Sequence, residues 1–200
     1  NLEVQTIQSH LVDLDILKKN KNSFFIVSNF CNLEKQYVDW LQSHAKYIIY
    51  EHDHKYLLTR NPAAYKEFKS PHRDLRNYFF YKNAAAVLTQ SSFHKKIVES
   101  NLGLKNIVNV SGNLWPLDVL QTLKTLARNE KKDCCSVLDS KIQHKNTYGA
   151  IKYCDDNKLE YKKVASNNYI NFLEKLSENK TFVFLPRTPE TLSRVVVEAR

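Results

Sequence analysis

The sequence predicts an α/β protein built from two Rossmann-like units with parallel sheets. Short runs of aromatic and β-branched residues alternate with helical or capped segments along the whole chain, which is typical of βαβ architecture. A connection at Gly112–Pro116 separates the halves, so we place the units at residues 1–112 and 116–200. The chain stops two residues after Glu198, inside an expected helix, and we therefore expect the second unit to be incomplete at its C-terminus.

The first unit is expected to contain four strands with helices between them. The strands are apolar runs, and the helices show helical spacing or a capping residue. The expected strands are Ser23–Phe30, Tyr47–Tyr50, Ala84–Thr89 and Ile107–Val110. The expected helices are Leu2–Asn20, one capped by Asn32 that reaches His44, one opened by Pro71, and one from Ser91 or Ser92 that ends at Gly103.

The second unit repeats this alternation and ends on a strand, a loop and a helix. The expected strands are Cys134–Leu138, Tyr161–Ala165 and Phe182–Leu185. The expected helices are Pro116–Arg128, Lys145–Asn157 and Tyr169–Glu178, followed by a last helix capped by Thr191 or Ser193. Pro186 and Pro189 fix φ and remove backbone donors, so the segment between them is a loop.

The composition is that of a globular protein with a basic surface. A net charge of +9 favours anionic partners, but 23 of the 30 basic residues are lysines, and base readout depends on arginine, so no nucleic-acid partner is expected. No apolar run approaches the ~20 residues of a membrane span, and no signal peptide begins the chain. We expect a cytoplasmic protein with its four cysteines as reduced core thiols, and we leave peripheral association with a membrane open.

Two carboxylates near the end of the chain are candidate ligand contacts. Glu190 lies on the loop after the last strand, and Glu198 lies eight residues later, about 12 Å away along a helix. Free backbone N–H groups at the helix start would lie between them and favour a phosphate. The alternative is a glutamate in the capping region and a solvated glutamate on the helix.

Two further groups follow expected strands. Lys141 and Lys145 lie between a strand and a helix, a placement that suits a diphosphate, although both also fit a solvated surface. The cluster Glu51–His54 follows the second strand and has three interpretations: a sugar contact, a metal site, or a polar strand end with solvent-facing histidines.

The segment Pro186–Ala199 resembles the Glu-x7-Glu signature of retaining glycosyltransferases with the two-domain GT-B fold. The family typically has Pro-x-x-x-Glu, a phosphate-contacting turn and a helix with Glu-Ala, and Pro186, Glu190, Glu198 and Ala199 fall in those places. The resemblance implies that Glu190 lies near the donor sugar and that Glu198 binds the ribose. It also implies that the amides that follow Glu190, at Thr191 and Leu192, hold the diphosphate, although the family usually has small residues there.

The resemblance extends to the two other groups of residues. Lys141 and Lys145 stand where the family has an arginine and a lysine on the donor phosphates. His52 with Asp53 is similar to the family's His-Asp pair that contacts the transferred sugar, with His54 as the second choice for that role.

The resemblance implies an enzyme of the hexosyltransferase class. It would move a sugar, with retention, from a nucleoside diphosphate sugar to a hydroxyl of a glycan, lipid or small-molecule acceptor. No metal and no cofactor other than this donor substrate are implied, and Glu190 and His52 would be the catalytic residues. Two alternatives remain: a non-catalytic α/β module of the same fold that binds a nucleotide or a partner, and a basic nucleic-acid-associated protein.

Overall fold

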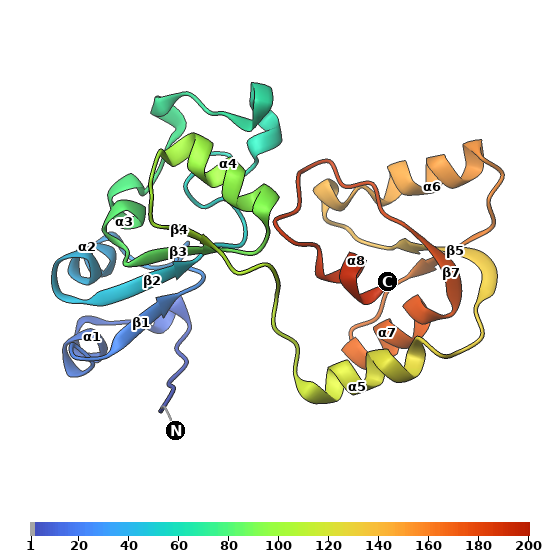
Figure 1. The fold of residues 1–200 in the computed structure, drawn as a ribbon, viewed down its shortest axis with the longest axis horizontal. Helices are drawn as coiled ribbons and strands as arrows, with labels where there is room; N and C mark the ends of the chain where they lie inside the picture. The colour runs from blue at the N-terminus through green and yellow to red at the C-terminus, as the bar shows by residue number, and fades with distance from the viewer. Residues whose placement is uncertain (1–2) are drawn as a thin grey trace. The chain divides into compact units, whose positions relative to one another are not determined.

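The computed structural model describes residues 3–200 and confirms the α/β class with parallel sheets (Figure 1). The chain divides into two compact units, Asn1–Gly112 (unit 1) and Asn113–Arg200 (unit 2), each with its own sheet. Within the described residues, no helix combines the length and apolarity needed to cross a lipid bilayer.

Unit 1 contains a four-stranded parallel sheet in the order β1-β2-β3-β4. The order follows the sequence, so each crossover helix returns the chain to the next position in the sheet. The strands are β1 (Phe24–Val27), β2 (Lys46–Tyr50), β3 (Ala86–Thr89) and β4 (Ile107–Asn109). The helices are α1 (Leu14–Lys19), α2 (Lys35–His44), α3 (Tyr78–Asn83) and α4 (Ser92–Leu102).

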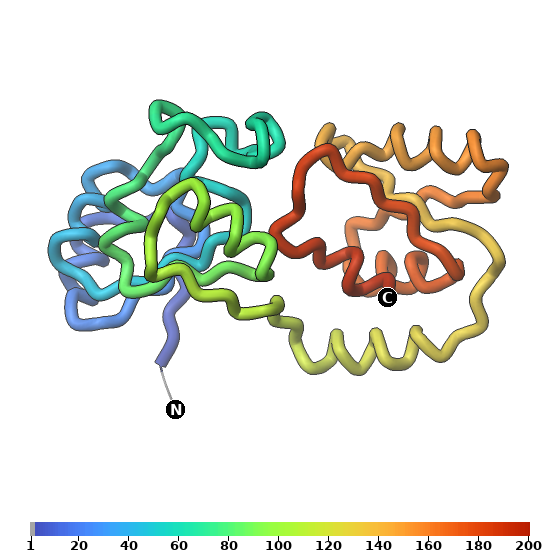
Figure 2. The backbone as a smooth tube through the Cα atoms, turned by 45° about the horizontal axis from the view of Figure 1, so that its top comes forward, coloured from blue at the N-terminus to red at the C-terminus, as the bar shows by residue number. Residues whose placement is uncertain are grey.

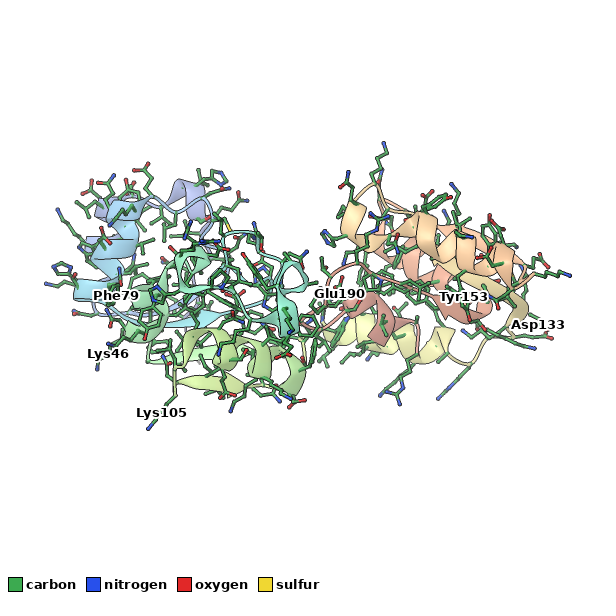
Figure 3. All side chains as sticks on the ribbon, turned by 90° about the horizontal axis from the view of Figure 1, so that it is seen from above. Lys46, Phe79, Lys105, Asp133, Tyr153 and Glu190 are labelled. Atoms are coloured by element: carbon green, nitrogen blue, oxygen red, sulfur yellow. The ribbon has the colours of Figure 1, made fainter. Side chains whose placement is uncertain are left out.

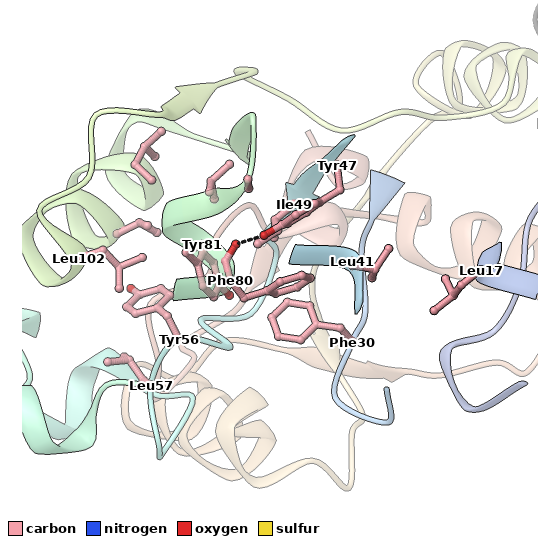
Figure 4. Close-up of a cluster of buried hydrophobic side chains, with 14 residues drawn as sticks. Leu17, Phe30, Leu41, Tyr47, Ile49, Tyr56, Leu57, Phe80, Tyr81 and Leu102 are labelled. Carbon is pink, nitrogen blue, oxygen red and sulfur yellow. Dashed lines mark hydrogen bonds between the residues drawn. The ribbon is translucent and has the colours of Figure 1, made fainter. Parts of the chain in front are cut away.

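The core of unit 1 lies between one face of this sheet and all four helices. Alternate strand residues point to this face, and they form one buried cluster with apolar side chains of the helices (Figure 4). The hydroxyl of Tyr47 donates to the carbonyl of Phe80 at 2.8 Å, so a buried polar tip is satisfied inside the cluster. The strand residues of the cluster are Tyr47, Ile49, Val87 and Ile107, and the helix residues are Leu17, Leu41, Phe80, Tyr81, Val98 and Leu102.

Two expected helices of unit 1 are wrong in their bounds. A 3-10 turn at Ser9–Leu11 precedes α1, and Asp13 caps α1 by accepting from the Ile16 amide at 2.7 Å, so the helix cannot extend back from there. Part of the expected helix, Leu2, lies outside the described residues.

Pro71 opens only the 3-10 turn His72–Asp74, and α3 begins at Tyr78. Asn77 takes a left-handed conformation with φ 56°, which separates the turn from the helix. The backbone between β2 and α3 has no strand and only short 3-10 turns, and it can be followed in Figure 2. Asn32 does not cap α2 either, because Glu34 occupies the N-cap position.

The prediction for α4 is confirmed at both ends. The Ser91 hydroxyl accepts from the His94 amide at 3.1 Å at the start of the helix. Gly103 ends the helix with φ 64°, and its N–H donates to the Glu99 carbonyl at 2.8 Å.

Unit 2 contains a three-stranded parallel sheet in the order β6-β5-β7. Because β5 is central, the chain moves to one side of it for β6 and then crosses to the other side for β7. The strands are β5 (Lys132–Leu138), β6 (Tyr161–Val164) and β7 (Asn179–Val183). The helices are α5 (Leu117–Leu126), α6 (Thr147–Asp156), α7 (Tyr169–Ser177) and α8 (Arg194–Glu198).

Helices α6 and α7 cover opposite faces of this sheet. Cys135 and Val137 of β5 pack against Ala150 and Cys154 of α6. Ser136 points to the other face, where its hydroxyl donates to the Leu176 carbonyl of α7 at 3.5 Å. The direction of the chain therefore reverses at β5, which makes the carboxyl ends of β5 and β7 a topological switch point.

The cysteine prediction holds for three of the four residues. Cys134, Cys135 and Cys154 are buried free thiols, whereas Cys31 is exposed and is not part of the core. Burial, followed by the neighbouring thiols, raises the pKa of both Cys135 and Cys154.

The last strand and helix differ from the prediction. β7 begins three residues earlier than expected, because Lys132 N–H donates to the Glu178 carbonyl at 2.8 Å and starts the β5–β7 ladder. β7 then ends at Val183. Helix α8 begins only at Arg194 and has five residues, and neither Thr191 nor Ser193 caps it through its side chain.

Candidate functional site

Two loops meet at the switch point of unit 2. The β5 loop, residues 139–146, follows β5, and the β7 loop, residues 184–193, follows β7. β5 and β7 are adjacent and parallel, so both loops leave the same edge of the sheet. In open α/β sheets, ligands bind outside the carboxyl ends of the strands at such a point. The edge between β5 and β7 is therefore the candidate site of this unit.

Side chains and backbone groups join the β5 loop to the β7 loop. Lys145 Nζ lies 2.9 Å from Glu190 Oε1, so two of the predicted site residues are brought into contact (Figure 3 labels Glu190). Asn146 Nδ2 donates to the Leu185 carbonyl at 2.8 Å, and its Oδ1 accepts from Arg187 Nε at 3.1 Å. The Arg187 amide also donates to the carbonyl of His144 at 2.8 Å. The two loops thus form one hydrogen-bonded surface.

The Lys145–Glu190 pair is partly accessible to solvent. The two side chains are 23% and 21% exposed, and the Lys145 ammonium also lies 5.7 Å from the centre of the Phe184 ring. Water reaches both charged groups and screens their attraction, so an anionic ligand can compete with Glu190 for Lys145. Lys141, on the same β5 loop, is exposed and forms no ion pair within residues 3–200.

Glu198 lies in a second group of side chains of unit 2, which we call the Glu198 cluster (Trp115, Tyr169, Arg194 and Glu198). Glu198 Oε1 accepts from Trp115 Nε1 at 2.9 Å and from the Tyr169 hydroxyl at 2.5 Å. The Arg194 guanidinium lies over both rings, 5.3 Å from the centre of Trp115 and 5.7 Å from that of Tyr169. Burial and the bond to Glu198 raise the pKa of Tyr169.

The alternative of a solvated helix glutamate is therefore wrong for Glu198, whose side chain is only 3% exposed. The cluster fixes this carboxylate by two hydrogen bonds to aromatic side chains. Thr191 and Leu192 lie in the β7 loop before α8, and Thr191 is 9% exposed. Their amides precede the helix and do not belong to its first turn.

His52 lies in unit 1, directly after β2, and is partly buried. Its backbone N–H donates to Glu51 Oε1 at 2.9 Å, and its Nδ1 lies 3.4 Å from the Tyr50 carbonyl. Burial, followed by the charge of Lys55, lowers the pKa of His52, so the ring is neutral at neutral pH. His54 is buried, with its Nδ1 2.9 Å from the Tyr56 hydroxyl, so the interpretation of His54 as solvent-facing is wrong.

A buried charge network beneath His52 was not predicted as a unit. Glu51 is fully buried, and its Oε1 accepts from the Asp53 amide at 2.8 Å and from Lys55 Nζ at 3.1 Å. Its Oε2 accepts from the Tyr81 hydroxyl. Burial alone would raise the pKa of Glu51, but the Lys55 ammonium and the Tyr81 hydroxyl hold it below its ordinary value. The sequence signal that could have indicated this network is the pair of opposite charges at Glu51 and Lys55, four residues apart. No group of three or more His, Cys, Asp or Glu within residues 3–200 is placed to hold a metal ion.

A glycine on α6 makes the loop contacts of unit 2 testable. A Cβ added at Gly149 would lie 2.3 Å from Nδ2 of Asn146, the side chain that bridges the β5 and β7 loops. We expect Gly149→Ala to displace Asn146, break its bond to Leu185 and lower the stability of unit 2 by about 1 kcal/mol. Urea unfolding in a Trp40→Phe background, in which Trp115 is the remaining tryptophan of the sequence, measures this change by fluorescence.

The control for this prediction is the same substitution without the bridging side chain. In an Asn146→Ala background, Gly149→Ala meets no amide and should instead stabilise α6 by about 0.5–1 kcal/mol. If Gly149→Ala has the same effect in both backgrounds, Asn146 does not transmit it.

The edge between β5 and β7 and the Glu198 cluster together give unit 2 cations, carboxylates and aromatic rings. Such groups suit a ligand that carries a diphosphate, hydroxyls and a planar ring. Protein-family models, curated proteins and solved structures give no match to this chain.

Proposed function

We propose that the chain is a retaining glycosyltransferase of the GT-B type that binds a nucleoside diphosphate sugar in unit 2. The acceptor would be a hydroxyl of a glycan, lipid or small molecule. The observation that carries this proposal is the contact of Lys145 with Glu190 between adjacent loops at the switch point of the unit 2 sheet. A cation and a carboxylate at that place suit the diphosphate and the sugar of one donor.

The diphosphate would replace Glu190 as the partner of Lys145. The donor carries two negative charges where Glu190 supplies one, and the pair is weak because water reaches both side chains. Lys141 is exposed on the same loop and would add a second cation. Both ammonium groups would stabilise the charge that develops on the leaving diphosphate, and Glu190, released from Lys145, would position the donor sugar.

Glu198 would bind the ribose through the oxygen that the aromatic side chains leave open. Trp115 and Tyr169 both donate to Oε1, so Oε2 is the acceptor for a ribose hydroxyl. Arg194 lies over both rings and 3.5 Å from Oε1, and it would have to move to expose the carboxylate. In unit 1, His52 offers a neutral ring that suits a hydrogen bond to a sugar hydroxyl.

The second candidate is a non-catalytic α/β module that binds a nucleotide or a partner. It is favoured by the burial of Glu198, which is 3% exposed and already bonded within its cluster. The two candidates share a binding site and differ in turnover.

A fluorescence titration tests the site itself. The chain has two tryptophans, Trp40 in unit 1 and Trp115 in the Glu198 cluster, so the Trp40→Phe protein reports on the cluster alone. Titration with UDP, GDP and ADP in the presence of EDTA should change Trp115 emission for one base. Lys145→Ala should weaken that binding by about 10- to 100-fold, which is the loss of one charge-assisted hydrogen bond.

Lys152→Ala is the matched control for this titration. Lys152 lies on α6 and pairs with Asp156 at 2.9 Å, and both side chains are more than half exposed. Its removal lowers the net charge by the same amount away from the β5 loop, so nucleotide affinity should stay unchanged. Equal losses in Lys145→Ala and Lys152→Ala, or no change in emission with any nucleotide, would contradict the proposed site.

A further inference from the structure

We propose that a groove in unit 1 binds an acyl-chain carboxylate, a small ligand with an apolar chain and a single carboxylate head. The groove has a volume of about 640 Å³, which is within the range of small-molecule sites. It lies among α2, the start of α3, and the segments that follow β1 and β2. All of its lining residues belong to unit 1, and the inference is independent of the function proposed for unit 2.

Apolar side chains from four separate segments line the groove. Leu33 follows β1, Val38 lies on α2, Leu58 follows β2 and Phe79 lies on α3. Leu58 is 56% exposed and Phe79 is 66% exposed (Figure 3 labels Phe79). An apolar chain seated between them would remove this surface from water, at about 25 cal/mol for each Å² covered.

The charged groups of the groove are mostly basic. Its lining contains Lys35, Lys55, Arg60 and Arg76 against the single carboxylate of Asp39, so it favours an anion. Lys35 pairs with Asp39, with their charged atoms 2.5 Å apart, and its side chain is 85% exposed, so water already solvates its charge.

The next two cations of the lining are also paired. Lys55 binds Glu51 at 3.1 Å and Asp53 at 2.5 Å, and Arg60 forms an ion pair with Asp53. Lys55 is itself buried, so its ammonium is committed to these carboxylates. Neither cation is therefore the anchor for a ligand.

Arg76 is the cation of the lining whose charge is left for a ligand. Its Nη1 donates to the carbonyls of Arg73 and Leu75, both at 2.8 Å, and it forms no ion pair within residues 3–200. These bonds hold one side of the guanidinium, and the edge formed by Nε and Nη2 has no partner in the described part of the chain. That edge presents two parallel N–H donors, the geometry that binds a carboxylate through both oxygens. One unmatched guanidinium suits one carboxylate better than a phosphate dianion.

The backbone around the groove is held in an unusual conformation. Arg60 and Asn77, which both line the groove, have φ values of 53° and 56°, in the left-handed region. The Asn77 side chain donates to the Lys55 carbonyl at 3.3 Å and ties the two segments together. A groove whose walls are fixed in advance loses less conformational entropy when a ligand binds.

An exposed cysteine makes occupancy of the groove measurable. Cys31 lines the groove and is exposed, whereas the other three cysteines are buried, so a thiol reagent in the full chain reports on this position. Decanoate should slow the reaction of Cys31 with Ellman's reagent in a saturable way. Decanol, with the same chain and no charge, should protect Cys31 about tenfold less effectively. Equal protection by decanol, or none by decanoate, overturns the inference.

Two pairs of substitutions connect the protection to the proposed contacts. Arg76→Lys keeps the charge and removes the planar fork, so it should weaken decanoate about tenfold, whereas Arg73→Lys should not. Phe79→Ala should weaken decanoate, whereas Phe93→Ala, at an exposed phenylalanine outside the lining, should not. The substituted side chains at 79 and 93 are 66% and 46% exposed, so both variants should fold. Unchanged affinity in both Arg76→Lys and Phe79→Ala contradicts the assignment.

Discussion

Lys55→Met is expected to lower the free energy of unfolding of unit 1 by about 3–5 kcal/mol. The Lys55 and Glu51 side chains are 1% and 0% exposed, and methionine fills the volume of lysine without its charge. Within residues 3–200, Glu51 would then keep the Tyr81 hydroxyl and backbone amides but lose the one cation paired with it, and Asp53 would lose one of its two. A buried carboxylate without a cation destabilises the fold far more than the intact buried ion pair does, because nothing offsets the loss of its hydration.

Urea unfolding of the Trp115→Phe protein measures this loss, because Trp40 then reports on unit 1 alone. Lys95→Met is the control, since Lys95 pairs with Glu99 at 3.5 Å on the exposed side of α4 and should change stability by less than about 1 kcal/mol. Adding Glu51→Gln to Lys55→Met should recover part of the loss, because it removes the uncompensated charge. A Lys55→Met loss no larger than that of Lys95→Met would show that the network is not a buried ion pair in solution.

Unit 1 is also expected to lose stability as the pH falls from about 7 to about 5. His54 and His94 are buried with their rings 4.9 Å apart, and the Nε2 atom of each has no hydrogen-bond partner among the residues that the structure describes. Burial lowers the pKa of His54 to about 4, and burial together with His54 lowers that of His94 to about 3. Glu51, Lys55 and His52 are the charged and titratable groups that act on this pair, and Tyr56 and the Gln90 amide contact it.

The sign of this change in stability with pH follows from the number of protons that the folded and unfolded chains bind. An unfolded histidine titrates near its ordinary pKa of about 6.5, so below that pH the unfolded chain binds protons that the folded chain does not. The stabilisation is therefore complete above about pH 6.5 and falls by about 2 kcal/mol for each histidine on reaching about pH 5. The depressed pKa of Glu51 adds a loss in the same direction, in the more acidic range where carboxylates protonate.

The free energy of unfolding of unit 1, measured by urea titration at a series of pH values, tests this dependence. Replacing both buried histidines by glutamine should remove most of the slope between about pH 7 and about pH 5, whatever the variant's stability at neutral pH, and His52, whose pKa burial also lowers, should account for the remainder. His72→Gln, at an exposed histidine of unit 1, should leave the wild-type profile intact. A wild-type profile that is flat over this range would contradict the prediction, because it would mean that the imidazoles bind protons equally well in the folded and the unfolded chain.

The sequence identified the strands better than the helices and turns. Buried strands are short apolar runs, and all seven appear near their predicted places, whereas Leu2–Asn20 fails because the local bond of Asp13 to the Ile16 amide starts a new helix. The turn after Pro71 ends because Asn77 adopts φ 56°, which no periodicity encodes.

The candidate site was predictable in part, because residues that directly follow parallel strands gather at one edge of the sheet. Lys145 and Glu190 follow adjacent strands, so parallel pairing brings them together. The environment of Glu198 was not predictable, because Trp115 reaches it from a position 83 residues earlier in the chain. Arg76 was missed for a related reason. Its lack of a carboxylate partner can be recognised only when the ion pairs of the neighbouring cations are known from the structure.

The proposed function is tested most directly by the release of nucleoside diphosphate from a panel of nucleoside diphosphate sugars, with acceptor mixtures and with EDTA. The protein should release one nucleotide at a measurable rate, and Glu190→Gln should lower that rate about 100-fold while nucleotide affinity stays within about threefold. Glu178→Gln, at an exposed glutamate paired with Lys132, should behave as wild type. Nucleotide binding without release from any donor would leave only the non-catalytic module, and the absence of both binding and release would contradict the account of unit 2.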